Sequence, residues 1–140
     1  MRDKVALGFV EAINSHDVDR IISFMSDDHI FIDAYGNRES KGSLEEGWKT
    51  YFNWFPDYSI EITDVFESGN SVAMFGFASG TYRSKAVPDI DNGTNRWRLP
   101  AAWKAVIDRE RIKEWQVCAD SKIPYDIMDA AKKEIVHENA

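Results

Sequence analysis

An aspartate and a histidine at the two ends of one short apolar run are the first side chains in this 140-residue chain that could carry acid/base chemistry. Asp33 follows His29-Ile30-Phe31-Ile32, and burial at the end of such a strand would raise the pKa of its carboxyl group and suit it to proton abstraction. His29 and Asp33 share one predicted strand face, so they could form a proton-relaying couple or a simple hydrogen-bonded pair at a rim. Asp33 could equally start the turn at Tyr35-Gly36, with its oxygens bound by backbone amides.

A third candidate acid/base residue is Asp120, at the end of the last predicted strand. It could instead cap the C-terminal helix or pair with Lys122. The histidines lack the spacing to other ligand side chains that metals require, and no glycine-rich phosphate loop occurs, so we expect neither a metal nor a cofactor. Cys118 lies in the middle of a predicted strand and is expected to be a buried core residue and not a reactive thiol.

Hydrophobic periodicity supplies the elements that must position these candidates. Helices are expected over residues 5–13, 18–25, 43–55 and 123–137, and strands over 29–33, 58–66, 71–83, 96–107 and 112–119. Asp17 is a predicted N-cap of the second helix, which Ser26-Asp27-Asp28 should close, and Ser43 with Glu46 forms a predicted capping box for the third. Residues 84–95 make a long polar connection of the kind that often serves as a lid or binding loop.

The order of these elements predicts a single α+β domain over residues 1–140, with a strongly bent antiparallel sheet packed on N-terminal helices. Strand 58–66 alternates with period two but slips near Asp64. Gly76 and Gly80 lie inside a long strand, where we expect them to mark bends or room beside a ligand.

Charge and composition narrow the possible partners and compartments. Seventeen Lys and Arg against 24 Asp and Glu give a net charge of -7, which disfavours nucleic acid as a partner. The single cysteine cannot form an intramolecular disulfide, and no apolar run approaches the ~20 residues needed to span a bilayer. We therefore expect a cytoplasmic protein with no membrane association.

Several short segments resemble, in order, proteins of one superfamily. Ala12-Ile13-Asn14-Ser15-His16-Asp17 followed by Met25-Ser26-Asp27-Asp28 looks like the opening of nuclear-transport-factor-2-like proteins. Phe55-Pro56-Asp57-Tyr58 and Gly69-Asn70-Ser71-Val72 resemble its SnoaL-like polyketide cyclase branch. Leu99-Pro100-Ala101-Ala102-Trp103, with Ile112, Trp115 and Asp120, is similar to the last hairpin of that branch and of limonene-epoxide hydrolase relatives. The resemblance spans residues 5–130 and implies a cone with a pocket at one end and, often, a homodimer through the outer face of the sheet.

The resemblance also carries expectations about activity. Asp33 matches the strand end at which ketosteroid isomerases hold their base, but the positions of their two oxyanion donors fall on Phe9 and on or next to Ala101, which cannot donate. Asp120 lies near the acid/base position of SnoaL-like cyclases, five residues after Trp115 where four would be expected. The epoxide hydrolase positions hold residues that cannot activate water, namely Gly76, Ala78 and Val117.

The aromatic excess, with eight Phe, five Trp and five Tyr, favours an apolar ligand pocket. The residues expected to line it are Phe9, Met25, Trp48, Tyr51, Phe52, Trp103, Trp115 and Val117. Arg83 and Arg98 flank the long loop and could clamp a ligand carboxylate or be solvated strand ends. Two functions remain open: a cofactor-free acid/base enzyme acting on a small apolar oxygenated molecule, with Asp33 or Asp120 as base, and a non-catalytic homodimer that binds a small molecule or a protein.

Overall fold

The computed structural model describes residues 2–83 and 95–138, with side chains as far as residue 132. Its helices are α1 (Arg2–Ser15), α2 (Val18–Ser23), α3 (Lys41–Trp54) and α4 (Lys122–Glu138). Its strands are β1 (Met25–Ile32), β2 (Arg38–Ser40), β3 (Ser59–Ser68), β4 (Ser71–Thr81), β5 (Arg96–Asp108) and β6 (Arg111–Ala119). Most of the predicted long loop, residues 84–94, lies outside the described residues.

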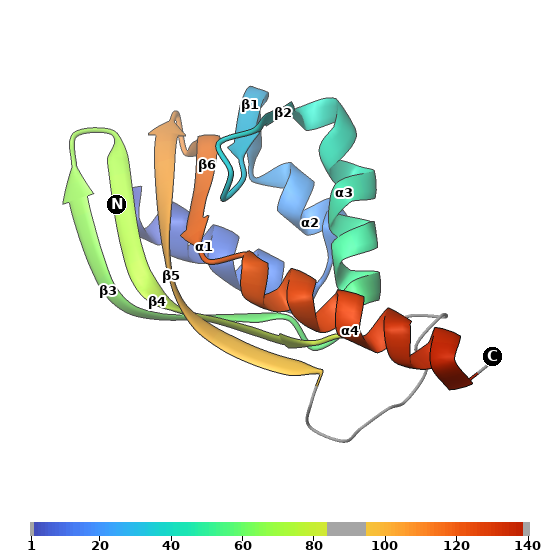
Figure 1. The fold of residues 1–140 in the computed structure, drawn as a ribbon. Helices are drawn as coiled ribbons and strands as arrows, with labels where there is room; N and C mark the ends of the chain where they lie inside the picture. The colour runs from blue at the N-terminus through green and yellow to red at the C-terminus, as the bar shows by residue number, and fades with distance from the viewer. Residues whose placement is uncertain (1, 84–94, 139–140) are drawn as a thin grey trace.

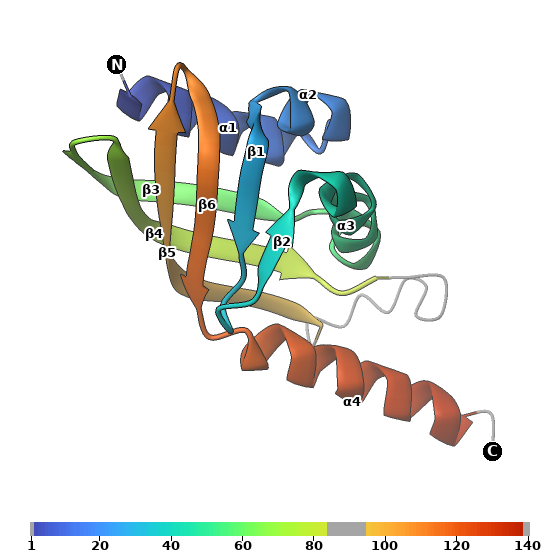
Figure 2. The ribbon, with the colours of Figure 1, turned by 90° about the horizontal axis from the view of Figure 1, so that it is seen from above.

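One strongly bent sheet, ordered β2-β1-β6-β5-β4-β3, holds all of these strands. Its neighbours are antiparallel except for β1 and β6, which run parallel. The long strands β3, β4 and β5 curve around α1, and α3 lies on the other side of α1 from these strands (Figure 1). Seen from above, α4 leaves the end of β6 and runs along the edge of the molecule (Figure 2). The predicted α+β layout is confirmed.

The bend has a local cause in β3 and β4. The register between these strands shifts between Ile62 and Asp64, so the predicted slip near Asp64 is a β-bulge. Gly76 lies opposite Ile62, and a Cβ on Gly76 would lie 1.8 Å from the carbonyl oxygen of Glu61. Glycine therefore allows the two backbones to approach at the bulge, which is the bend that its place in the strand predicted.

The end of α1 is fastened to the edge strand β3 through Asn14. Its side-chain amide donates to the Ile60 carbonyl at 3.0 Å, and its side-chain oxygen accepts from the Ile60 amide at 2.8 Å. His16 follows in the left-handed region with a φ of 59°, at the turn between α1 and α2. Asp17 then caps α2 by accepting from the Arg20 amide, which confirms the predicted N-cap.

Three local predictions were wrong. Ser26-Asp27-Asp28 does not close a helix but belongs to β1, because Met25 pairs with Ile112 on β6, far away in the chain. The capping box does not form, because α3 already begins at Lys41 and the hydroxyl of Ser43 donates to the Ser40 carbonyl inside its first turn. The short strand β2 was not predicted and is held by pairing with β1.

Candidate functional site

A cavity of about 450 Å3 lies between α3, the centre of the sheet and the start of α4. Five of the expected pocket residues line it: Trp48, Tyr51, Trp103, Trp115 and Val117. Pairing explains the last three, since Trp103 lies opposite Val117 and Ala105 lies opposite Trp115 in the β5–β6 ladder. The wall is completed by Phe31, Asp33, Ala34, Tyr35, Glu39, Leu44, Glu46, Gly47, Thr50, Trp54, Tyr58, Ile60, Ser121 and Tyr125.

The other three expected pocket residues lie elsewhere. Phe9 is fully buried and packs edge-on against Trp115, with ring centroids 4.8 Å apart. Met25 is a buried core residue at the start of β1. Phe52 does not line the cavity and stacks on His16, with centroids 4.1 Å apart. Residue type suited all three to a pocket wall, but packing placed Phe9 and Met25 in the core and Phe52 against the α1–α2 turn.

The cavity wall contains two neighbouring tyrosines, Tyr51 and Tyr58, of which only Tyr51 was predicted from the sequence. The rings of Tyr51 and Tyr58 meet edge-on at 4.9 Å, and both residues line the cavity. Burial raises the pKa of both hydroxyls, while their mutual hydrogen bond raises the pKa of Tyr51 and lowers that of Tyr58. With raised pKa values, both hydroxyls keep their protons at neutral pH. The sequence signal that could have indicated Tyr58 was its position directly after Phe55-Pro56-Asp57, in a segment that resembles SnoaL-like proteins.

Two tryptophans of this wall have indole nitrogens without a hydrogen-bond partner among the described residues. Trp48 is 8% exposed and Trp103 is 2% exposed. The N–H group of each is buried without an acceptor among the described residues. Buried N–H groups normally have partners, and an unpaired one costs ~1–3 kcal/mol. The two tryptophan rings therefore add aromatic surface to the wall, while their nitrogens are closed off from solvent.

Asp33 lines the cavity and is at the same time the first residue of a tight turn. Its Oδ1 accepts from the Tyr35 and Asn37 amides at 2.9 Å each, and its Oδ2 accepts from the Asn37 side-chain amide at 3.2 Å. Backbone amides therefore bind Asp33, as one of the two alternatives predicted, and the residue also lines the cavity. The turn fixes the carboxylate without burying it.

Asp120 does not line the cavity, although its neighbour Ser121 does. It is exposed, and its Oδ1 accepts from the Lys122 amide at the start of α4. The side chain of Lys122 pairs with Asp126 at 2.8 Å and not with Asp120. Asp120 is therefore bound to the backbone at the start of α4, close to the capping role that was the alternative to chemistry.

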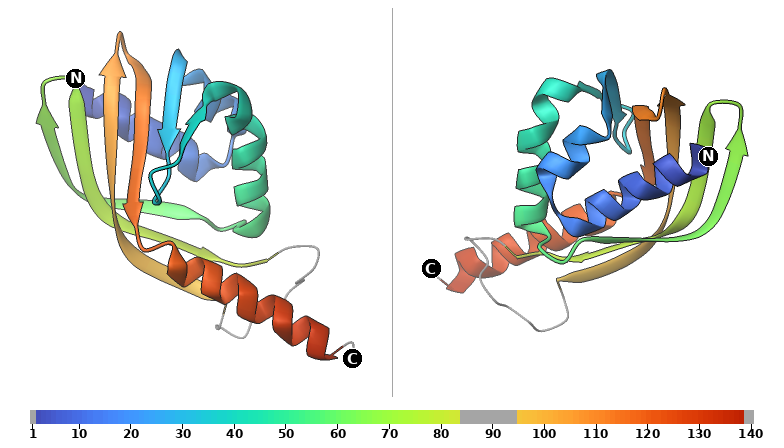
Figure 3. Two further views of the ribbon diagram at one scale, coloured as in Figure 1. Left: turned by 45° about the horizontal axis from the view of Figure 1, so that its top comes forward. Right: turned by 180° about the vertical axis from the view of Figure 1, so that it is seen from behind.

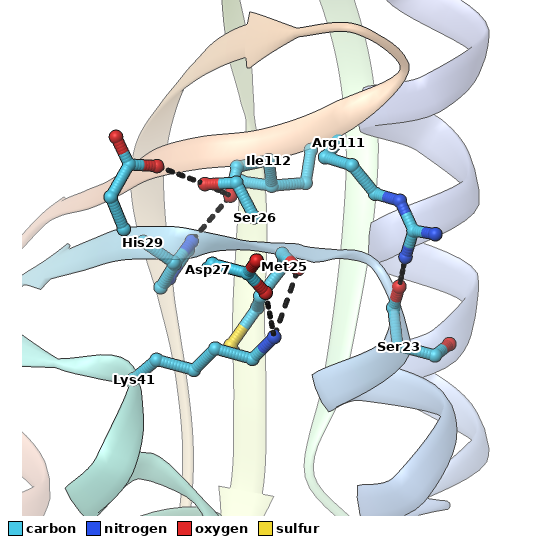
Figure 4. Close-up of polar contacts among 9 residues, drawn as sticks. Ser23, Met25, Ser26, Asp27, His29, Lys41, Arg111 and Ile112 are labelled. Carbon is cyan, nitrogen blue, oxygen red and sulfur yellow. Dashed lines mark hydrogen bonds and ion pairs between the residues drawn. The ribbon is translucent and has the colours of Figure 1, made fainter.

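His29 is 1% exposed and lies outside the cavity, between β1 and β6 (Figure 4). Its Nδ1 lies 2.6 Å from the Ile112 carbonyl, which can only accept, so Nδ1 carries the proton. The predicted couple with Asp33 does not form. The two residues are four positions apart, and an extended strand rises about 3.3 Å per residue, which separates them by about 13 Å.

The environment of His29 predicts an acid-sensitive fold. Burial lowers its pKa, which the Ile112 hydrogen bond partly opposes; Lys41 lowers it further, while Asp28 and Glu114 raise it. The folded state therefore binds a proton on His29 less readily than the unfolded state does. The contribution of neutral His29 to the stability of the fold is complete above the unfolded pKa near 6.5 and is lost as pH falls below it. We expect the free energy of unfolding, from urea titrations, to fall between pH 7 and pH 5, and the slope to flatten in His29→Gln. Equal slopes in the two proteins would contradict this role.

Other charged and reactive candidates also lie away from the cavity. Arg98 pairs with Glu61 at 3.1 Å and lies 3.8 Å over the Phe77 ring, so the predicted carboxylate clamp is wrong; neither Arg83 nor Arg98 lines the cavity. Cys118 is exposed, not buried, because it follows the cavity-lining Val117 and so faces the opposite side of β6. In the described part of the chain, no group of His, Cys, Asp and Glu side chains could hold a metal ion. Nor is any described helix long and apolar enough to cross a membrane.

Solved structures share this fold at low sequence identity. A proposed SnoaL-like polyketide cyclase from Shewanella denitrificans OS-217 superposes with a TM-score of 0.75 and 18% identity, over 92% of this chain and 97% of the other. IdmH, a proposed polyketide cyclase from Streptomyces antibioticus, gives 0.75 and 18% over 92% and 99%. A protein with a ketosteroid isomerase-like fold from Catenulispora acidiphila DSM 44928, in complex with trimethylamine, gives 0.71 and 14% over 85% and 87%. At such identities the likeness shows the fold alone.

Sequence comparison goes further than these superpositions. No match was found among curated proteins. The SnoaL-like domain family, however, matches residues 6–115, which contain the cavity wall from Phe31 to Trp115. That stretch covers most of the chain and ends within β6. The chain therefore belongs to the SnoaL-like domain family.

Proposed function

We propose that the cavity binds a small, largely apolar molecule that carries oxygen, and that the protein acts on it as a cofactor-free acid/base enzyme of the cyclase, isomerase or hydratase type. The observation that carries the proposal is an aromatic cavity of about 450 Å3 that contains both the Tyr51–Tyr58 pair and Asp33. That volume falls in the range of small-molecule sites, which combine apolar walls with a few polar groups.

The chemistry follows from the two kinds of polar group. A carboxylate held by turn hydrogen bonds can accept the proton on a carbon next to a ketone, and the C–H electrons move onto the ketone oxygen. Tyr58 can donate to that developing enolate, because burial raises its pKa and keeps its hydroxyl protonated. This donor replaces the oxyanion groups whose expected positions hold Phe9 and Ala101.

Binding of β-tetralone, a compact bicyclic ketone, tests the site. We expect chemical-shift changes to saturate on titration and to be weakened at least tenfold by Val117→Trp, which fills space at the cavity wall. Val65→Trp, at an exposed position on β3, is the matched control and should bind like the natural protein. Binding that survives Val117→Trp undiminished would place the ligand elsewhere and defeat the proposal.

The second function, non-catalytic binding, is supported by two observations. Asp33 is already engaged by three turn hydrogen bonds, and Asp120 caps α4 outside the cavity. A protein of this kind would bind β-tetralone without speeding the exchange of its α-hydrogens for deuterium. Exchange measured by NMR in D2O therefore separates the enzyme from the binder.

We also propose a homodimer through the outer face of the sheet. Phe66 is 60% exposed and Phe75 is 47% exposed, and their rings contact each other at 5.9 Å on that face. Exposed neighbouring aromatics are a common feature of association surfaces. Light scattering at micromolar concentration should give twice the chain mass, and Phe75→Ser should lower it; a monomer in both cases would overturn the dimer.

A further inference from the structure

The charged side chains that line the cavity, among the described residues, are all acidic. Its ionisable carboxylates are Asp33, Glu39 and Glu46, and no lysine, arginine or histidine lines it among the described residues. Glu46 lies 3.7 Å from Lys49, which also binds Glu45 at 3.1 Å, so its charge is partly balanced. Asp33 and Glu39 form no ion pair within the described chain, and the groups that bind Asp33 are neutral amides. The wall thus carries uncompensated negative charge.

Two exposed tyrosines stand at the same end as Asp33. Tyr35 is 68% exposed and Tyr125 is 46% exposed, and both line the cavity. The turn that carries Tyr35 lies beside the first turns of α4, which carry Tyr125 (Figures 2 and 3). Burial raises the pKa of Tyr125, and the nearby Tyr35 and Asp33 raise it further. We call Asp33, Tyr35 and Tyr125 the cavity mouth.

The faces of tyrosine rings attract cations, by ~0.5–1 kcal/mol at exposed sites, and an adjacent carboxylate adds to that attraction. Behind these residues lies an aromatic cavity of about 450 Å3, large enough for the apolar body of a small ligand. An anion, in contrast, would meet carboxylates without any lining cation.

We propose that the cavity mouth binds a cationic nitrogen, a protonated or quaternary amine, on a ligand whose apolar body fills the cavity. This rests on the proposed binding function and adds the charge class of its ligand. The turn amides occupy three of about four lone-pair positions on Asp33, and charge attraction to a quaternary nitrogen does not use the fourth. The subsite is therefore compatible with Asp33 as the proposed base.

Three probes with one aromatic body test the charge class: naphthylmethyl trimethylammonium, naphthylmethanol and naphthylacetate. By calorimetry in low salt we expect the ammonium to bind about fivefold more tightly than the alcohol and about tenfold more tightly than the carboxylate. The preference should shrink in 0.5 M NaCl, because exposed charges are screened. An ammonium that binds no better than the alcohol would overturn the cation subsite while leaving the proposed cavity function intact. If none of the probes binds, the proposed function itself fails.

Variants locate the effect at the mouth. Asp33→Asn should reduce the preference for the ammonium over the alcohol to about twofold or less, with little change for the alcohol. Glu67→Gln removes the same charge from β3, outside the cavity wall, and should keep the full preference. Tyr125→Leu, which leaves the Asp33 turn intact, should also lower the preference and serves if Asp33→Asn disturbs folding. Equal behaviour of all three variants would refute the assignment to Asp33 and Tyr125.

Discussion

Replacing Asp33 with asparagine should slow the exchange of the α-hydrogens of β-tetralone for deuterium by about 100-fold or more, while the ketone still binds. A positioned general base typically contributes ~10²–10⁴-fold, and the amide of asparagine cannot accept the proton at neutral pH. The amide oxygen can still accept from the Tyr35 and Asn37 backbone amides, so the turn should persist. Exchange followed by NMR in D2O, together with the binding titration, separates loss of chemistry from loss of binding.

Asp120 supplies the matched control for this prediction. Asp120→Asn removes a carboxylate of the same kind from the start of α4, outside the cavity wall, and should leave exchange unchanged. Tyr58→Phe should slow exchange without abolishing binding, because the enolate loses its donor. If Asp120→Asn abolishes exchange and Asp33→Asn does not, the base has been assigned to the wrong residue. If the natural protein does not speed exchange at all, non-catalytic binding is the better description.

Local signals in the sequence predicted much of the fold. Asp17 is of a residue type that commonly caps helices, and it accepts from the first turn of α2. The slip near Asp64 is visible in the sequence as a break in the two-residue alternation of strand 58–66. Pocket residues on the paired strands β5 and β6 were also predictable, since alternation places Trp115 and Val117 on one face. Such features depend on neighbours a few residues away.

The failures involve contacts between distant segments. No local feature of the sequence near Met25 indicates that this residue pairs with Ile112. Because of that pairing, β1 begins earlier than predicted. Phe52 and Tyr51 are adjacent aromatic residues on one helix, but only Tyr51 lines the cavity, while Phe52 stacks on His16. The partnership of Tyr51 with Tyr58 likewise requires the end of α3 and the start of β3 to meet. Site chemistry is therefore less predictable than the elements that carry it.

Gly76→Ala should destabilise the protein by about 3 kcal/mol, or prevent folding, although it adds a single methyl group. The new Cβ would lie 1.8 Å from the Glu61 carbonyl oxygen and 2.8 Å from its carbon, both of them backbone atoms that no rotamer change can move. Relief requires β3 to move away from β4 at the bulge, which would also shift Ile60 and Tyr58 at the cavity wall. Urea unfolding measures the loss, and β-tetralone titration should show weakened binding if the variant folds.

Gly42→Ala is the matched control for the same chemical change. A Cβ on Gly42 would meet no atom within 4 Å, and Gly42 lies in α3, where alanine is favoured over glycine by ~0.5–1 kcal/mol. We therefore expect this variant to be at least as stable as the natural protein. If Gly76→Ala were as stable as Gly42→Ala, the close approach of β3 and β4 would not exist in solution. The curvature that opens the cavity would then need another origin, because this bulge is where the two strands bend together.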